Sequence, residues 1–258
     1  MLTVPVAVAR KELSDHLRDR RALVSTGLYT LMGPAVVWLV SSTSRGGDGA
    51  PSIVFPVMAA VFTLIAAFTG SMSVAADMVA GERERRSLLP LLLNTSSRFD
   101  IVVGKWVAAS SFAAAGALVC LAAFTVLLAF AGSTAPSGRT LILLVPPLVT
   151  LAAAAAALEL FVSTVCRNLK EANTYLGMLI FVVMGVAMLL AFRPQSAASW
   201  WFLVPIGGHE RLLQLAFVTG DWPLSEAAIL GGLSLALTLA LLVAAAKALH
   251  RDSIVYGG

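Results

Sequence analysis

The chain has 258 residues, of which 59% are hydrophobic and 12% are charged, and its mean hydropathy is +0.89. Soluble domains carry about 25% charged residues, so this composition excludes a soluble fold and predicts an integral membrane protein. The net charge of +4 comes from short Lys and Arg clusters beside apolar runs, a pattern that indicates membrane orientation and argues against a nucleic-acid partner.

Six apolar runs are long enough to form membrane-spanning helices, because a helix needs about 20 residues to cross the hydrocarbon layer. Strands of an outer-membrane barrel would instead show short alternating segments. The sequence therefore predicts an all-α polytopic membrane protein with a single transmembrane domain over residues 1–258. The expected spans are residues 22–40, 53–79, 98–131, 140–165, 173–192 and 224–249.

Residues 4–21, before the first span, carry an amphipathic helical pattern. One stripe of this helix holds Val6, Ala9, Leu13 and Leu17. The segment is too charged to insert, so it is expected to lie along the inner membrane surface or to pack as a solvated helix on the protein's own spans. Because it contains both signs of charge and no uncharged core, the first span is expected to act as the insertion signal.

The segment 199–219, before the last span, is apolar but interrupted. Its centre holds Pro205, two glycines, His209, Glu210 and Arg211. A charged group at the bilayer midplane costs about 3 kcal/mol on insertion scales, so a full crossing is unfavourable. We therefore predict a pair of short re-entrant helices on the extracytoplasmic side that dip into the outer leaflet and return.

The orientation follows from the distribution of Lys and Arg. With both termini inside, 14 of the 18 Lys and Arg residues lie on the inner side. The outer side holds Arg45, Arg139, Arg193 and Arg211. This bias predicts cytoplasmic termini.

No sequence motif indicates catalysis by this chain. Gly104 and Lys105 lack the earlier glycine and the following hydroxyl of a phosphate-binding loop, and the three histidines fall in separate segments. Cys120 and Cys166 are expected at different depths, so a disulfide is not predicted. We expect no catalytic residue, no metal site and no cofactor bound by this chain.

Two carboxylates near the inner ends of spans are candidates for a transport path or for gating. Glu159 lies inside the fourth predicted span, where an ionisable group by default indicates a functional site and needs a partner. A structural role is also compatible, with Glu159 bonded to a neighbouring helix, to Arg167 or to an arginine of the 83–86 block. Asp77 lies at the inner end of the second span, where an aqueous boundary makes its charge inexpensive.

The loop at 80–97 joins the second and third predicted spans and has two parts. Its first part, Gly81 to Ser87, can continue the preceding helix with Glu82 and Arg86 paired at i, i+4. The second part surrounds Pro90 with five leucines, at positions 88, 89 and 91–93. This loop is too short to form its own core, so we expect the leucines to bind in a groove of a cytosolic partner.

Three segments resemble a known family. GERERRSLLPLLLNTSSRFDIVVGK (81–105) resembles the signature loop of the membrane subunits of type-2 ATP-binding-cassette exporters. CRNLKEANTY (166–175) resembles the second inner loop of the sodium-extrusion branch of that family, and LHRDSIVYGG (249–258) resembles its C-terminal ending. Six spans, an amphipathic N-terminal helix and a re-entrant element also match.

The resemblance implies a permease subunit in the bacterial cytoplasmic membrane, packed with a second permease copy and with membrane lipid. Two copies of a cytosolic ATPase subunit would bind ATP and Mg²⁺ and drive export. Ser87 to Leu93 would form the coupling helix seated in that ATPase, with a second inner contact at Lys170 and Glu171. The contact residues implied on the first loop are Glu82, Arg83, Arg86, Ser87, Leu88, Leu89, Leu91, Leu92 and Arg98.

The chain departs from the family pattern at two places. Arg86-Ser87-Leu88-Leu89 stands where the family usually has Gly-Thr followed by an apolar residue and Glu, and the loop at 41–52 replaces a large extracytoplasmic insertion. The first hypothesis for function is the export of a lipidic, amphipathic, peptide or ionic substrate. The alternative is a membrane scaffold or mechanotransmitting subunit that recruits an ATPase without moving a solute.

Overall fold

The computed structural model describes residues 3–44, 54–88, 97–130, 136–192, 204–219 and 223–249. In chain order, the elements of these ranges are the helices α1 (Thr3–Arg18), α2 (Arg20–Ser44), α3 (Val54–Ala76), η1 (Asp77–Gly81), α4 (Glu82–Glu84), α6 (Arg98–Phe130), α7 (Gly138–Val165), α8 (Leu169–Ala191), α9 (Pro205–Gln214), η3 (Leu215–Thr219) and α10 (Leu224–Ala248). Six helical stretches are long and apolar enough to cross a membrane, which confirms the predicted all-α polytopic class.

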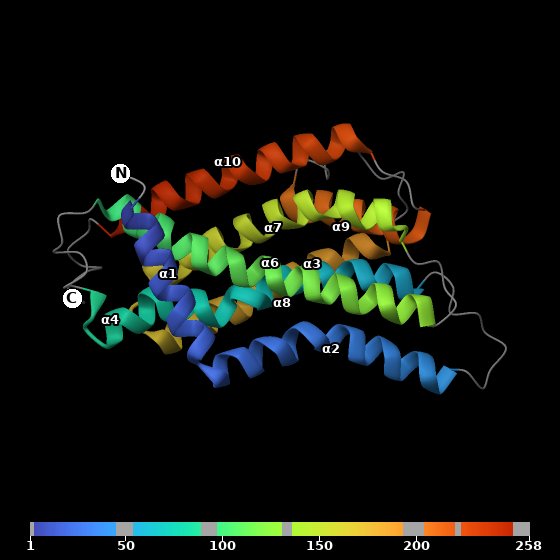
Figure 1. Ribbon diagram of the computed structural model, residues 1–258, viewed down its shortest axis with the longest axis horizontal. Helices are drawn as coiled ribbons and strands as arrows, with labels where there is room; N and C mark the ends of the chain where they lie inside the picture. Colours follow the sequence, from blue (N-terminus) through green and yellow to red (C-terminus); the bar gives the residue numbers. More distant parts are fainter. Residues whose placement is uncertain are drawn as a thin grey trace.

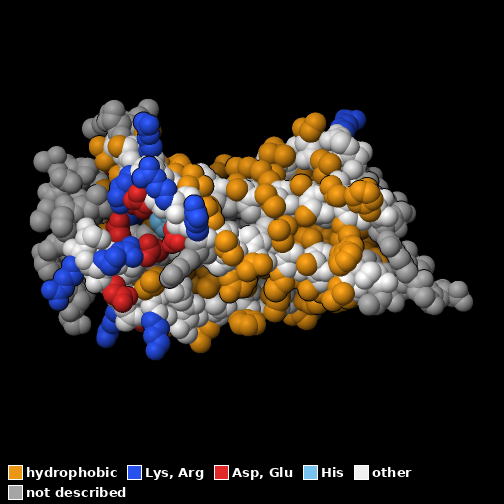
Figure 2. All heavy atoms as spheres, turned by 60° about the horizontal axis from the view of Figure 1, so that its bottom comes forward, with side chains coloured by type: hydrophobic (Ala, Val, Ile, Leu, Met, Phe, Trp, Pro, Cys, Tyr) orange, Lys and Arg blue, Asp and Glu red, His pale blue; other side chains and the backbone are white. Residues whose placement is uncertain are grey.

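The spans run side by side along the long axis of the molecule, and α1 crosses them at one end (Figure 1). That end also carries α4 and the last turns of α10, and it is called the charged end below. Figure 2 shows why: blue and red side chains gather there, whereas orange apolar side chains cover the face along the rest of the bundle. A belt of exposed apolar side chains is what lipid-facing helices require.

The helix α3 is the most buried of the six spans and contacts α2, α6, α7 and α8. Its closest neighbour is α6, because both helices have glycine where they cross. A Cβ atom at Gly70 would lie 2.9 Å from the backbone oxygen of Phe112, and one at Gly116 would lie 3.1 Å from that of Ala66. Small residues therefore allow backbone contact here, as they do commonly in membranes.

Two predicted span boundaries differ from the structure. The second span does not end at residue 79 but continues as a helix to Glu84, through the five-residue π-helix η1. The fifth span begins at Leu169 and not at residue 173, because Asn168 caps it: the Asn168 side chain accepts a hydrogen bond from the Glu171 backbone N–H. Lys170 and Glu171 are therefore in the first turn of α8 and not in a loop.

The helix α1 packs against α6 through a face that includes only part of the predicted stripe. Its buried side chains are Ala9, which belongs to the stripe, and Glu12 and His16, which do not; the stripe residues Val6 and Leu17 are 62% and 58% exposed. The expected packing on the protein's own spans is therefore present, with a polar contact face and an apolar flank. At the opposite end of the molecule, α9 and η3 form one helical stretch within the predicted re-entrant segment 199–219. Residues 199–203 lie outside the described residues, so the pair of re-entrant helices stays a prediction.

Candidate functional site

The charged end is built around the π-helix η1. A π-helical turn shifts the backbone hydrogen bonds by one residue and leaves groups that neighbouring helices must satisfy. Ser163 of α7 does so twice: its hydroxyl accepts a hydrogen bond from the Ala80 N–H at 3.1 Å and donates one to the Ala76 carbonyl at 3.0 Å. Lys105 of α6 donates to the Met78 carbonyl at 2.8 Å. Contacts from two other spans thus hold η1 in its register.

Lys105 is also the centre of a buried ionic cluster. Its Nζ lies 2.9 Å from Glu12 Oε1 and 2.7 Å from Glu82 Oε2, and with Met78 O these partners occupy all three N–H donors. The second cation, Lys11, lies 3.3 Å from Glu12 and 3.4 Å from Glu82. We call these four residues the Lys105 cluster. It joins α1, α4 and α6 at one point.

Attraction between opposite charges stabilises the Lys105 cluster. Burial alone would raise the pKa of Glu12, but the nearby Lys105 and Lys11 outweigh burial and lower it below its ordinary value of 4.5. Burial lowers the pKa of Lys11, and the carboxylates of Glu12 and Glu82 outweigh this and raise it. Glu12 and Lys11 therefore remain ionised at neutral pH. Each buried charge of the cluster needs its partners, since an unpaired buried charge is costly.

The residues after Glu82 reach three further elements. Arg83 donates hydrogen bonds to the carbonyl oxygens of Thr164, at 2.8 Å, and Cys166, so it caps the end of α7. Glu84 accepts a hydrogen bond from the Leu169 N–H at 3.1 Å, at the start of α8. Arg85 binds both carboxylate oxygens of Asp77 in η1, at 2.8 and 2.9 Å, and His16 of α1 lies 3.8 Å from the same carboxylate.

The helix ends at Arg86, whose φ of 58° is in the left-handed region that terminates helices. The Ser87 N–H then donates to the Glu82 carbonyl at 2.9 Å. Leu88, the next residue, is only 3% exposed and packs with Val79 and Val102 in the chain's own core. The prediction that the loop leucines are free for a partner is therefore wrong for Leu88; Leu89, Leu91, Leu92 and Leu93 lie outside the described residues.

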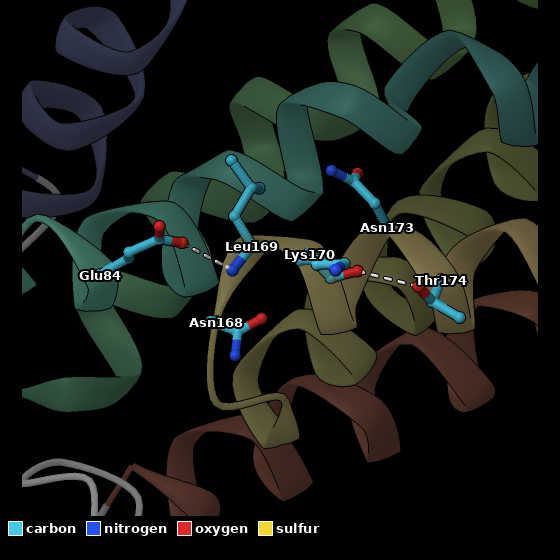
Figure 3. Close-up of a pocket in the computed structure, with 6 residues that line it drawn as sticks. All are labelled: Glu84, Asn168, Leu169, Lys170, Asn173 and Thr174. Carbon is cyan, nitrogen blue, oxygen red and sulfur yellow. Dashed lines mark hydrogen bonds between the residues drawn. The ribbon is translucent and has the colours of Figure 1, made fainter.

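A polar hollow of about 800 Å³ lies beside this segment (Figure 3). Its walls are Glu84, Asn168, Leu169, Lys170, Asn173 and Thr174. In Figure 3, Glu84 points from α4 toward the backbone of Leu169, which closes one side of the hollow. Lys170 is exposed and, within the described residues, takes part in no ion pair, whereas Glu171 turns back to accept a hydrogen bond from the Arg167 N–H at 2.7 Å.

The remaining predicted site residues are held inside the fold. Arg98 donates to the Leu249 carbonyl and so joins the start of α6 to the end of α10. Glu159 is fully buried and accepts a hydrogen bond from Ser71 Oγ at 2.6 Å; among the residues that the structure describes, no arginine binds it. Among the alternatives for Glu159, the structure shows the hydrogen bond to a neighbouring helix. Glu82 pairs with Lys105 and not with Arg86.

Comparisons with known proteins show to which family the chain belongs. A family profile described as "ABC-2 family transporter protein" matches residues 6–217. The chain belongs to the ABC-2 transporter family. It is 30% identical over 184 residues to the ABC transporter permease protein NatB of Bacillus subtilis, an alignment of 66% of this chain and 46% of that protein. It is 32% and 35% identical to the probable ABC transporter permease proteins NosY of Pseudomonas aeruginosa and Stutzerimonas stutzeri, over 38% and 39% of this chain and 36% of each relative.

The family resemblance inferred from the sequence is thus confirmed: the chain is a multi-pass membrane protein of the ABC-2 transporter family. It spans less than half the length of the curated relatives that it matches. Within the described residues, no group of three or more His, Cys, Asp or Glu side chains could hold a metal ion.

Sequence reasoning missed the most connected residues of this ABC-2 family member. From the sequence, Lys105 is considered only as part of a Gly-Lys pair, and Glu12 is not singled out. A usable signal existed for Lys105, because it follows Ile101 to Gly104 and precedes a long apolar run, where a lysine needs a carboxylate partner. Nothing in the sequence identifies Ser163 as the residue that satisfies η1.

Proposed function

We propose that this chain is one permease half of an ATP-driven exporter, with the charged end in the cytoplasm of a bacterium. The Lys and Arg bias toward that end supports the orientation. The curated relatives, all described as ABC transporter permeases, support the class. A separate cytosolic subunit would bind ATP and Mg²⁺ and hydrolyse the nucleotide.

The observation that carries the proposal is the set of contacts made by residues 82–85. Four consecutive side chains bond to different parts of the bundle: Glu82 to α1 and α6, Arg83 to the end of α7, Glu84 to the start of α8 and Arg85 to η1. A push on the loop that follows is therefore transmitted to at least four helices at once. An ATPase needs such a connection, because packed elements shift between discrete arrangements as units.

The docking surface for the ATPase would combine loop 89–97 with the exposed groups beside it. Lys170 and Glu84 line the polar hollow, and Arg86 and Ser87, which follow Glu84 within three residues, are exposed, as is Lys170. Glu171 orients the start of α8. Charges on such a rim guide a complementary partner and set its register. The two cations on this rim favour an acidic contact on the ATPase.

The second permease copy would pack on α2 and α8. These are the least buried spans, and they expose large apolar side chains such as Leu28, Tyr29, Phe181 and Val182. A crevice of about 350 Å³ separates α2 and α8 over α3, and its lining is almost wholly apolar. We propose that two copies enclose the translocation path there, which favours a lipidic, amphipathic or peptide cargo over a hydrophilic ion.

Glu159 and Asp77 are proposed to act in gating through η1. Glu159 lies one turn before Ser163 on the same face of α7, so the residue that bonds α3 and the residue that bonds η1 move together. Asp77 begins η1 and is held by Arg85. A change in the π-helical register would alter both contacts.

The test is co-purification with the ATPase subunit after charge reversal on the docking surface. Arg86→Glu with Lys170→Glu is expected to abolish co-purification and ATP hydrolysis while leaving the stability of the permease unchanged, because both side chains are exposed. Arg139→Glu, an exposed arginine at the start of α7 on the opposite end, is the matched control. Full co-purification of the double variant would defeat the assignment. Substrate-dependent stimulation of hydrolysis in vesicles then distinguishes an exporter from a scaffold.

A further inference from the structure

An apolar groove of about 680 Å³ runs between α1 and α6 at the charged end. Val6, Leu13 and Leu17 line it from α1, and Val103 and Val107 line it from α6. It lies on the flank of α1 that the Lys105 cluster does not use. Val6, Leu13 and Leu17 belong to the apolar stripe that the sequence shows, and no described part of the chain covers Val6 or Leu17.

Two cations stand at the edge of this groove. Arg10 and Arg18 both line it and both are exposed. Within the described ranges neither guanidinium belongs to an ion pair, whereas the neighbouring Lys11 pairs with Glu12 and Glu82. They are eight residues apart on one helix, so they stand about 12 Å from each other along its axis. An anion above the groove would meet positive charge on either side.

The depth of the groove matches the lipid headgroups. The helix α6 has 33 residues, whereas about 20 cross the hydrocarbon layer. Counted from its far end at Phe130, the hydrocarbon boundary falls near residue 110. Val107 is then within one turn of that boundary, and Val103 is a further turn out, at headgroup level. Arg10 and Arg18 are thus at the depth of lipid phosphates.

We infer that this groove binds an anionic phospholipid of the leaflet at the charged end, with the phosphate between Arg10 and Arg18 and the upper acyl chain against Val103 and Val107. Apolar contact and two free cations together select an amphipathic anion over a zwitterionic lipid. Gly104 brings α1 against α6 beside the groove, and Glu12 joins α1 to Lys105. A bound lipid therefore stabilises the position of α1 and, through it, of α4.

The test is photolabelling in nanodiscs of phosphatidylcholine that contain a phosphatidylglycerol probe with a photoreactive group at the top of one acyl chain. Label is expected in the peptides of residues 3–18 and 98–110. Arg10→Gln with Arg18→Gln is expected to reduce this label about 25-fold, because each basic residue near an anionic surface contributes about 1 kcal/mol, close to a factor of five. Val107→Trp, which fills the groove and keeps both arginines, is expected to reduce the label as well.

Lys247→Gln is the matched control, because Lys247 is an exposed cation at the same end of the molecule but on α10. It is expected to label like the unmodified chain. Equal labelling by a phosphatidylcholine probe, or full labelling of the double arginine variant, would overturn the inference. The measurement needs no ATPase, so its failure and the failure of the docking proposal are seen separately. If Arg10→Gln with Arg18→Gln leaves the lipid label unchanged and, in a separate assay, reduces ATPase binding, a protein and not a lipid occupies the groove.

Discussion

Removal of the buried ammonium of Lys105 is the sharpest test of how the charged end is held together. Lys105→Met keeps the length of the side chain and leaves Glu12 and Glu82 buried without their shared cation. Breaking a buried ion pair from one side costs about 3–5 kcal/mol. Lys11 remains within 3.4 Å of both carboxylates and compensates in part. We therefore expect a loss near the lower limit, about 3 kcal/mol.

The assay is the apparent Tm of the purified permease in detergent. A loss of 3 kcal/mol corresponds to about 6–12 °C for a chain of this size. The decisive comparison adds Glu12→Gln and Glu82→Gln to Lys105→Met, which removes the uncompensated charges. This triple variant is expected to regain most of the lost Tm, because a neutral replacement of a buried ionic group is often tolerated. If Lys105→Met alone stays within about 2 °C of the unmodified chain, or if the triple variant is less stable than the single one, the reasoning fails.

Three further outcomes are expected. Gly104→Ala should lower the Tm and expose α1 to proteases, because a Cβ at this position would lie 2.6 Å from Val8 Cβ. A Cβ at Gly232 would meet nothing within 4 Å, so Gly232→Ala should leave the Tm and the protease resistance unchanged. Arg83→Gln should cost about 1.5–3 kcal/mol of stability, because it leaves the last carbonyls of α7 without their hydrogen-bond donor. Arg83→Lys should not restore this stability, since an ammonium lacks the two parallel donors of a guanidinium. Equal Tm values for the Arg83→Lys variant and the unmodified chain would contradict this. Burial disfavours the Glu12 carboxylate, but Lys105 and Lys11 outweigh burial and lower its pKa, so the ionised carboxylate stabilises the fold. This stabilisation is complete above the ordinary pKa of 4.5 and is lost as the pH falls through the folded-state pKa. The Tm difference between the unmodified chain and Glu12→Gln should therefore shrink only below pH 4.5, and a difference that stays constant would refute this.

Some local features depend on short-range sequence signals alone. A capping box opens the third span: Ser97 Oγ accepts a hydrogen bond from the Asp100 N–H at 3.1 Å and donates one to the Asp100 carboxylate at 2.7 Å. The alanine run 152–157 of α7 is a second such signal, because small side chains allow close helix approach, and all six of its residues are buried. Both signals involve residues a few positions apart, so the chain itself brings the groups together.

Asp77 and Leu88 show where sequence reasoning stopped. The sequence places Asp77 at the aqueous end of a span and names no partner for it, but the π-helical turn and the helix beyond it place Arg85 on its carboxylate. Leu88 is expected to be available to a partner because its loop is too short to form a core, but the left-handed residue Arg86 turns the chain back so that Leu88 packs in the core of the bundle. A register shift of one residue in a helix and one reversed φ angle are enough to redirect such side chains.

The sequence by itself determined the number of spans, the side on which charge gathers and the family to which the chain belongs. Hydrophobic length and local charge are properties of short segments, and the membrane acts on each segment almost independently. Only the tertiary structure decided that Lys105 finds its carboxylates on residues 93 and 23 positions away, and that residues 82–85 bond to four different parts of the bundle. The geometry of those bonds depends on how α1, α3, α6 and α7 cross, which hydropathy does not encode.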